Sequence, residues 1–256
     1  SRATQSLLAP GSVIKPIAVY GPALNAGLIT PATVYDDTPF TFGSEAWPKN
    51  EDDIYHGLTT ILDAMKRSSN TVAVKVLDDL GLDYAYNYAF NEMGLDTLVD
   101  AYELNGVEYT DKSYWSLALG GTVQGITIRD MTAAYAAVEN GGVYRTARTY
   151  TKVLDSEGEL VLDNTQSTRT VLDEKAAYYL TYMMEETVKS GTGVEAQISG
   201  MSVAGKTGTT SDDQDRWFAG YTPYHTAVVW CGYDQPQEVV LQDDSIDNPA
   251  AVLWNK

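Results

Sequence analysis

The amino-acid sequence predicts an α+β fold, in which helices flank an antiparallel sheet. Stretches with helical spacing of apolar residues fill much of the chain before residue 191, whereas strand-like runs follow one another near its end, at 202–209, 216–222 and 226–233. The short separations between these runs favour antiparallel neighbours. Helices followed by a meander of strands are typical of α+β or three-layer architectures.

The first expected elements lie before Gly81. The stretch 11–27 opens as a helix that glycine and proline interrupt, and the Thr- and Pro-containing stretch 27–42 is expected to be extended or a loop. Apolar residues at helical spacing through 58–65 predict a helix that ends close to residue 68. A second helix follows at once, and Gly81 is expected to stop it.

The middle of the chain predicts further helices and one hairpin. A short helix is expected over 82–94, and the clearest helix begins after Thr127, which can cap it, and ends at a glycine pair. A β-hairpin is expected around 156–159. A long amphipathic helix capped by Asp173 completes the helical part.

The composition predicts a globular protein with an acidic surface. The chain has 256 residues, 44% of them hydrophobic, and its 17 basic and 35 acidic residues give a net charge of -18. Such a surface repels a phosphate backbone, so no nucleic-acid partner is expected. The acidic residues are dispersed in short pairs, which favours a solvated surface; the pairs begin at positions 36, 52, 78, 212 and 243.

The sequence offers neither a membrane span nor a recognisable metal site. No apolar run approaches the ~20 residues that a membrane helix needs, and the N-terminal residues lack the architecture of a signal peptide. The single cysteine, Cys231, stands in an apolar run, where a packing role is expected. His56 and His225 are isolated, so no metal site, no Ser-His-Asp triad and no cofactor are expected.

The stretch "GMSVAGKTGTT" at 200–210 fits two motifs. Residues 200–207 match the phosphate-binding P-loop of nucleotide hydrolases, and Lys206 begins a Lys-Thr-Gly-Thr strand motif of serine acyl-transfer enzymes. A P-loop needs a buried strand before its first glycine and a helix at its lysine. Here polar, glycine-broken residues precede Gly200 and a glycine follows Thr207, which disfavours the nucleotide hydrolase.

Two upstream motifs support the acyl-transfer interpretation. "GSVIK" contains Ser12 and Lys15, which share one face if the segment is helical, and "RSSN" contains Ser68 and Asn70 between two expected helices. Each motif alone is common, and its residues, taken alone, would be ordinary cap or strand residues. Their order before the late Lys-Thr-Gly-Thr strand is typical of class A β-lactamases and penicillin-binding proteins.

The chemistry explains why these residue types are needed. Ser12 would attack an amide carbonyl and requires an adjacent base, which Lys15 supplies if burial and a nearby cation, Lys206, keep it neutral. Lys15 is therefore expected within hydrogen-bonding reach of Ser12 and Ser68. Ser68 would relay a proton to the leaving nitrogen, and Asn70 would hold the substrate amide.

The strand motif would bind the substrate. Thr207, Gly208 and Thr209 are the expected substrate-binding residues, because the two threonine hydroxyls could hold a carboxylate beside the glycine. The backbone N–H groups of Ser12 and Thr209 could form an oxyanion hole.

The chain resembles the transpeptidase domain of bifunctional, class A penicillin-binding proteins over nearly its whole length. Stretches such as "RATQSLLAPGSVIKP", "SLALGGTVQGITIRDMTAAYAAVENGGVY" and "GKTGTTSDDQDRWFAGYTP" are similar to that family and occur in its order. The resemblance implies a β-lactamase/transpeptidase-like fold and D,D-transpeptidation of peptidoglycan stem peptides ending in D-Ala-D-Ala. It also implies acylation by β-lactams and a place outside the bacterial cytoplasmic membrane, beside a glycosyltransferase domain and a membrane anchor.

The chain differs from the family in the position of its first motif, which in the family lies well inside the transpeptidase domain. Only eleven residues precede Ser12. Residues 1–256 are therefore expected to form one transpeptidase domain without its N-terminal strands, glycosyltransferase domain or anchor. An N-terminal portion of the same protein is expected to pair with the edge of the run 226–233, which would otherwise be long and apolar.

Two other functions on the same fold stay open. A β-lactamase would need a further carboxylate to activate water, and the nearest match, "YELNG" at 102–106, has a different spacing. A penicillin-sensing module would use the same motifs without turnover.

Overall fold

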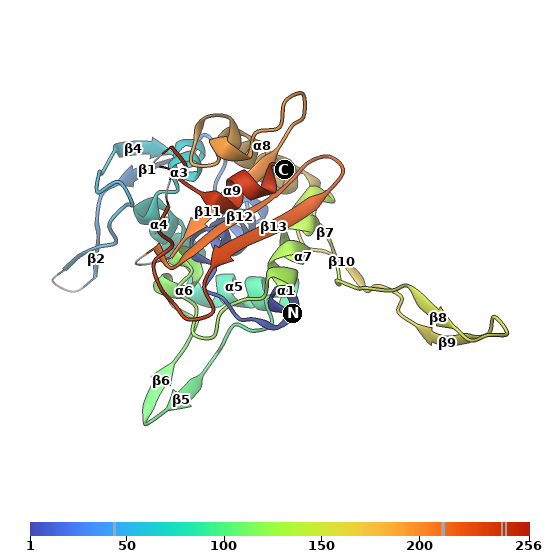
Figure 1. Cartoon of the computed structure of the whole chain (residues 1–256). Helices are drawn as coiled ribbons and strands as arrows, with labels where there is room; N and C mark the ends of the chain where they lie inside the picture. Colours follow the sequence, from blue (N-terminus) through green and yellow to red (C-terminus); the bar gives the residue numbers. More distant parts are fainter. Residues whose placement is uncertain (43–44, 211–212, 242, 244) are drawn as a thin grey trace.

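The sheet has the predicted antiparallel meander. The computed structural model describes residues 1–42, 45–210, 213–241, 243 and 245–256. The strands β11, β12 and β13 lie side by side in that order (Figure 1); they span Ala204–Thr209, Asp215–Tyr221 and Thr226–Gly232. The α+β prediction is therefore confirmed.

The sheet separates two cores. Trp217 and Ala219 of β12 enter the large core, whereas Phe218 between them enters a smaller one. Successive side chains of a strand point to opposite faces, so each face of β12 is covered. Helices α7 (Ile128–Glu139) and α8 (Glu174–Ser190) supply the large core, and α9 (Pro249–Trp254) packs in the smaller one. The result is a three-layer arrangement.

An irregular helical segment runs through the large core. It consists of the 3-10 turn η1 (Gly11–Ile14), the π-helical turn η2 (Pro16–Tyr20) and helix α2 (Gly21–Asn25). Every side chain of η2 is buried, as is typical of a helix that is apolar on all sides. Proline lacks a backbone donor, so Pro16 and Pro22 interrupt a regular helix, as predicted.

The paired helices before Gly81 are confirmed, with a break between them. Thr60 Oγ1 accepts a hydrogen bond from the backbone of Asp63 and caps the first helix, and Ser69 caps the second. Ser68 lies between them with φ +58°, in the left-handed region. The elements here are α3 (Ile61–Arg67), α4 (Asn70–Leu80), α5 (Leu82–Asn87) and η3 (Tyr88–Glu92).

The two later helices begin at the predicted caps. Thr127 Oγ1 accepts from the backbone N–H of Asp130 at 3.1 Å, and Asp173 accepts from that of Ala176 at 2.6 Å. Side chains at these positions satisfy N–H groups that have no partner within the helix. The remaining short helices are α1 (Arg2–Gln5), α6 (Tyr114–Leu119) and η4 (Val194–Ala196).

Small antiparallel pairs of strands decorate the body. They are β1 (Val34–Asp37) with β4 (Gly57–Thr60), β2 (Phe40–Phe42) with β3 (Glu45–Trp47), β5 (Tyr102–Leu104) with β6 (Val107–Tyr109), β7 (Val143–Arg145) with β10 (Thr168–Thr170), and β8 (Lys152–Leu154) with β9 (Leu160–Asp163). The β8–β9 pair confirms the hairpin predicted around 156–159.

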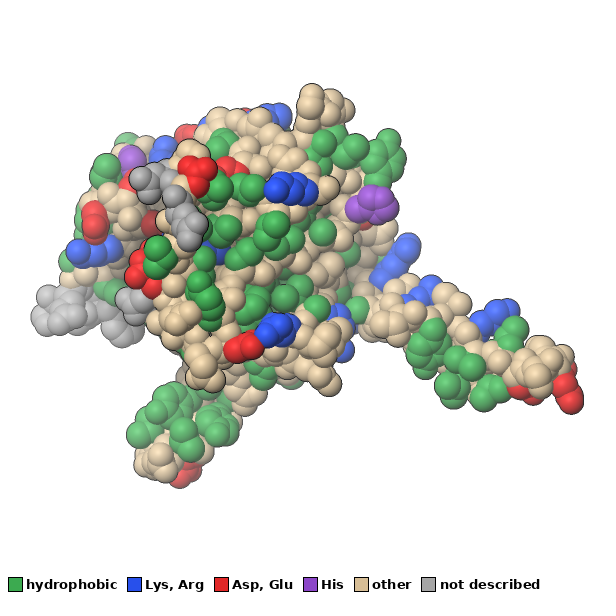
Figure 2. Space-filling model, in the orientation of Figure 1, with side chains coloured by type: hydrophobic (Ala, Val, Ile, Leu, Met, Phe, Trp, Pro, Cys, Tyr) green, Lys and Arg blue, Asp and Glu red, His purple; other side chains and the backbone are tan. Residues whose placement is uncertain are grey.

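Two of these hairpins project from the body. The β5–β6 and β8–β9 arms extend away from the sheet and its helices (Figure 1). Apolar side chains gather on both arms (Figure 2), and those of β8 and β9 are exposed. Within the described ranges no helix has the length and apolar character needed to cross a membrane.

Candidate active site

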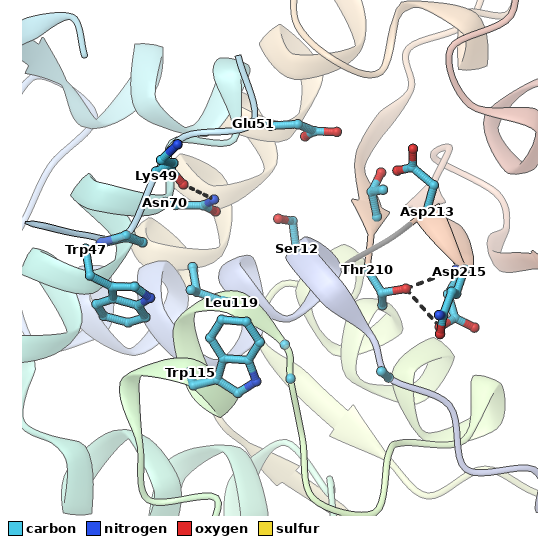
Figure 3. Close-up of a pocket in the computed structure, with 16 residues that line it drawn as sticks. Ser12, Trp47, Lys49, Glu51, Asn70, Trp115, Leu119, Thr210, Asp213 and Asp215 are labelled. Atoms are coloured by element: carbon cyan, nitrogen blue, oxygen red, sulfur yellow. Dashed lines mark hydrogen bonds between the residues drawn. The ribbon is translucent and has the colours of Figure 1, made fainter. Parts of the chain in front are cut away.

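Ser12 lies at the floor of a pocket beside the sheet. It follows Gly11, which has φ +54° and on which a Cβ would come within 2.6 Å of the carbonyl oxygen of Thr209. Only glycine allows the η1 turn to approach β11 this closely. Ser12, Asn70 and Thr209 line a pocket of about 570 Å³ together with two tryptophans and several carboxylates (Figure 3).

Lys15 is fully buried behind the pocket and bonds the predicted Ser-x-Asn loop. Its Nζ lies 2.7 Å from the carbonyl oxygen of Ser68, 2.6 Å from Asn70 Oδ1 and 3.3 Å from Ser68 Oγ. A neutral amine has two N–H donors and one lone pair. Two oxygens that only accept and one hydroxyl that can also donate match that inventory, so the contacts accommodate an uncharged Lys15 as well as a charged one with three donors.

Of the two contacts expected for Lys15, with Ser12 and with Ser68, the structure shows one. The bond to Ser68 is present, but within the part of the chain that the structure describes no hydrogen bond joins Lys15 Nζ to Ser12 Oγ. The physical reason is that the amine is already occupied by Ser68 and Asn70. A proton passing from Ser12 to Lys15 therefore requires one of these bonds to loosen.

Burial holds both lysines toward the neutral form, and the charge of Lys206 adds to this effect at Lys15. Burial, followed by the charge of Lys206, lowers the pKa of Lys15 well below its ordinary range. Burial lowers the pKa of Lys206 to about 7. The negative charge of Glu51 acts in the opposite direction on both pKa values. The effect of Lys206 on the Lys15 pKa therefore has the direction expected of a nearby cation.

Some side chains of the strand motif face the protein interior, and others face the pocket. Lys206 Nζ donates to the carbonyl oxygen of Thr207 at 3.2 Å, and Thr207 Oγ1 donates to Thr192 Oγ1 at 2.7 Å. Thr207 is nearly buried, whereas Thr209 lines the pocket and its Oγ1 accepts from Arg216 at 3.3 Å. Of the expected substrate-binding residues, only Thr209 therefore borders the open pocket.

Gly208 allows β11 to pack closely against the segment around Ser12. A Cβ on Gly208 would lie 2.8 Å from the carbonyl oxygen of Pro10 and 3.0 Å from Val13 Cγ1. Lys206 and Thr207 both belong to β11, whereas a P-loop would start a helix there. The nucleotide-hydrolase alternative is excluded by this geometry.

A buried network that the sequence analysis did not foresee holds the Ser-x-Asn loop. The Asn50 side chain donates to Asp37 and accepts from the backbone N–H of Asn70 at 2.9 Å. Asp37 also accepts from Thr71 and Ser69. Burial alone would raise the pKa of Asp37, but the hydrogen bonds from its neighbours lower it, so the carboxylate stays charged and the loop stays fastened.

Asp37 corrects the expectation that the acidic pairs form only a solvated surface. Asp36 is exposed as expected, but Asp37 is fully buried because four donors compensate its charge. The paired residues Asp212 and Asp244 lie outside the described residues. No sequence pattern distinguished Asp37 from the other paired carboxylates, since its donors come from distant positions.

Other pocket residues were also missed. Trp47 ends β3, Lys49 and Glu51 lie in the loop between β3 and β4, and Trp115 and Leu119 belong to α6 (Figure 3). Asn70 Nδ2 donates to the carbonyl oxygen of Lys49 at 2.8 Å, so that loop forms one wall of the pocket. The match at 102–106 belongs instead to the projecting β5–β6 arm and does not line the pocket.

Comparison with known proteins identifies related sequences and folds. The family model described as the penicillin binding protein transpeptidase domain matches residues 1–251. The chain is 37% identical over 253 residues to penicillin-binding protein 1A of Clostridium botulinum, covering 95% of this chain and 29% of that protein. It is 32% identical to penicillin-binding protein 4 of Bacillus subtilis, covering 93% of this chain and 36% of that protein. The chain thus spans about a third of the length of these relatives.

Solved structures share the fold. The D,D-transpeptidase domain of a peptidoglycan glycosyltransferase from Eggerthella lenta is similar with a TM-score of 0.72 and 26% identity, covering 90% of this chain and 61% of that one. The PonA1 protein from Mycobacterium tuberculosis in complex with penicillin V is similar with a TM-score of 0.76 and 25% identity, covering 92% and 63%. The predicted β-lactamase/transpeptidase-like fold is confirmed.

Proposed function

Because the chain belongs to the penicillin-binding protein transpeptidase family, we propose that it is a serine D,D-transpeptidase that cross-links peptidoglycan stem peptides. The observation that carries the proposal is the buried Lys15, bonded to Ser68 and Asn70 directly behind the pocket that Ser12 lines. Its pKa is lowered, first by burial, and this favours the unprotonated amine that a general base requires.

Acylation would proceed as follows. Ser12 Oγ attacks the carbonyl carbon between the two D-alanines, and its proton passes to Lys15 Nζ. The backbone N–H groups of Ser12 and Thr209 stabilise the oxyanion. The C–N bond then breaks, and the proton reaches the departing D-alanine nitrogen through Ser68.

An amine of a neighbouring stem peptide would then resolve the acyl-enzyme. Its nitrogen forms the new amide, the bond between Ser12 Oγ and the carbonyl carbon breaks, and a proton returns to Ser12. A β-lactam acylates the same oxygen, but its leaving nitrogen remains tethered to the acyl group. That tether hinders displacement, so the inhibited enzyme should persist.

The β-lactamase and sensor alternatives share this first step. A β-lactamase would activate water with a carboxylate, and Glu51 does line the pocket, which the sequence analysis did not anticipate. The decisive difference is the lifetime of the acyl-enzyme. We place the reaction at the extracytoplasmic face of the bacterial membrane, where stem peptides are cross-linked.

Timed release of a fluorescent penicillin tests the proposal. The natural protein, with whatever sequence flanks residues 1–256, is labelled, freed of excess reagent and followed over time, and D-alanine release from a donor peptide is measured in parallel. We expect a stable label together with D-alanine release. Rapid loss of label would indicate a β-lactamase, and a stable label without D-alanine release would indicate a sensor.

We further propose that an N-terminal portion of the same protein completes the sheet. Strand β13 pairs with β12 on one side, and among the described residues no strand pairs with its other edge. Natural proteins usually cover such edges. Arg2 Nε donates to Asp234 Oδ1 at 2.7 Å, just beyond the end of β13, so a segment preceding Ser1 would emerge beside that edge.

Residues 1–256 produced alone are therefore expected to aggregate or to fail to bind penicillin, because the β13 edge would pair with other chains. The natural protein should remain soluble and become labelled. Size-exclusion chromatography and fluorescent labelling of both proteins measure the difference. A monomeric 1–256 fragment that binds penicillin as well as the natural protein would contradict this arrangement.

A further inference from the structure

Glu51 projects into the pocket above the nucleophile. It comes from the loop that forms one wall, and its carboxylate extends over Ser12 toward the opposite wall, which carries Thr210 and Asp213 (Figure 3). The proposed transpeptidation uses Ser12, Lys15 and Ser68 but assigns Glu51 no role.

Glu51 differs from the other carboxylates of the pocket in that it has no partner among the described residues. Asp215 accepts hydrogen bonds from Thr210 and Trp230, and Asp213 lies 3.2 Å from the guanidinium of Arg216. Considering the described residues alone, no hydrogen bond or ion pair engages the Glu51 side chain. Its negative charge is therefore available to a ligand that enters the pocket.

The negative charge of Glu51 affects the pKa values of the two buried lysines. Its carboxylate raises the pKa values of the buried Lys15 and Lys206 against the larger effect of their burial. Neither amine bonds Glu51, but Glu51 and Ser12 line the same pocket (Figure 3). A cation bound by Glu51 would consequently sit close to the Ser12 ester.

The position of Glu51 is fixed by its neighbours. Asn50 Oδ1 accepts from the backbone of Asn70, and Asn50 Nδ2 donates to the carbonyl oxygen of Ile54 at 2.8 Å. The carbonyl oxygen of Lys49 is bonded by Asn70 as well. Lys49 and Asn50, directly before Glu51, are thus tied to the Ser-x-Asn loop, and this holds the backbone of Glu51 at the pocket.

The same pocket offers an apolar surface for an aliphatic chain. Trp47 and Trp115 both line it, and Trp115 leaves 49% of its surface exposed. Methylene groups pack on indole faces, and an ammonium group near an indole gains cation–π attraction. A carboxylate beyond an aromatic wall therefore suits a primary ammonium group carried on a flexible hydrocarbon chain.

We propose that Glu51 is the specificity determinant for the acceptor, binding a primary alkylammonium group whose methylene chain lies against Trp115. The inference rests on the proposed transpeptidase function and names the substrate class of its second step. The bound ammonium releases one proton to solvent. The resulting amine nitrogen bonds the acyl carbon, the bond from that carbon to Ser12 Oγ breaks, and the second proton passes to Ser12 Oγ.

Acceptor titration in the natural protein tests this assignment. The enzyme is acylated with a D-Ala-D-Ala donor peptide, and transfer to Nα-acetyl-lysine amide is measured against hydrolysis by mass spectrometry. We expect the Glu51→Gln variant to need about tenfold more acceptor, or more, for half-maximal transfer, because a hydrogen bond to a charged group is lost. The acceptor concentration that the Glu51→Asp variant needs for half-maximal transfer should lie between those of Glu51→Gln and the parent.

The Asp53→Asn variant is the matched control. Asp53 lies on the same loop, does not line the pocket, and has φ +56°, which asparagine tolerates. It changes the net charge equally, so an effect confined to Glu51→Gln supports a local site. An unchanged half-maximal concentration in Glu51→Gln would overturn the inference while leaving transpeptidation intact.

Two further outcomes also decide the matter. Slower hydrolysis in Glu51→Gln with unaltered acceptor dependence would overturn the inference and identify Glu51 as a base for water. Failure of the parent to form an adduct on Ser12 would overturn the proposed function, and the acceptor site with it.

Discussion

Replacing Ser12 with alanine is expected to abolish covalent capture of penicillin. The Ser12→Ala variant loses the side-chain hydroxyl that the η1 turn presents to the pocket, while Gly11 still allows the close approach to Thr209. Alanine fits the same turn, so the fold should survive. Intact-mass measurement of the natural protein should show one penicilloyl adduct, mapped to the peptide containing Ser12, and none in the variant.

Ser6→Ala is the matched control for this prediction. Ser6 lies in the same N-terminal stretch but does not line the pocket, so its variant should acquire the adduct at the parent rate. An adduct that persists in Ser12→Ala would show that another side chain is the nucleophile. Unchanged far-ultraviolet circular dichroism in both variants would exclude unfolding as the reason for lost labelling.

The sequence predicted the features that local chemistry determines. Thr127 and Asp173 could be identified as caps because an oxygen-bearing side chain next to an apolar helix satisfies free N–H groups. The meander was predictable because each of its strands is short, apolar and close to the next. The order of the motifs that contain Ser12, Ser68 and Lys206 pointed to one pocket. The structure places Ser12 in that pocket and buries Ser68 and Lys206.

The missed features depend on contacts between distant positions. Asp37 is one of several paired carboxylates in the sequence, and its burial follows from donors at Asn50, Ser69 and Thr71 that only folding assembles. Glu51 stands in a similar acidic run, so its place above Ser12 could not be predicted from composition. The β5–β6 hairpin is different, because its Asn-Gly turn at 105–106 is a strong local signal that was overlooked.

The electrostatics of Lys15 connect its burial to both rate and stability. A lysine whose pKa is lowered on folding binds fewer protons in the folded state than in the unfolded state. Between that lowered pKa and the ordinary value of about 10.4, the unfolded state therefore takes up protons, and stability rises with pH. Removing the amine should weaken this dependence, which provides a readout separate from catalysis.

The Lys15→Met variant is accordingly expected to acylate about 10²–10⁴ times more slowly, the usual loss when a general base is removed. Methionine has a similar length and no charge, so it can occupy the buried site. In the parent the acylation rate should fall on the acid side as Lys15 is protonated, and the variant should lack that limb. Stopped-flow labelling across a pH series measures both effects, with Lys66→Met, outside the pocket, as the control. A Lys15→Met variant that acylates at the parent rate, or keeps the acid limb, would remove Lys15 from the proton path and leave Lys206, whose pKa lies at about 7, as the candidate base.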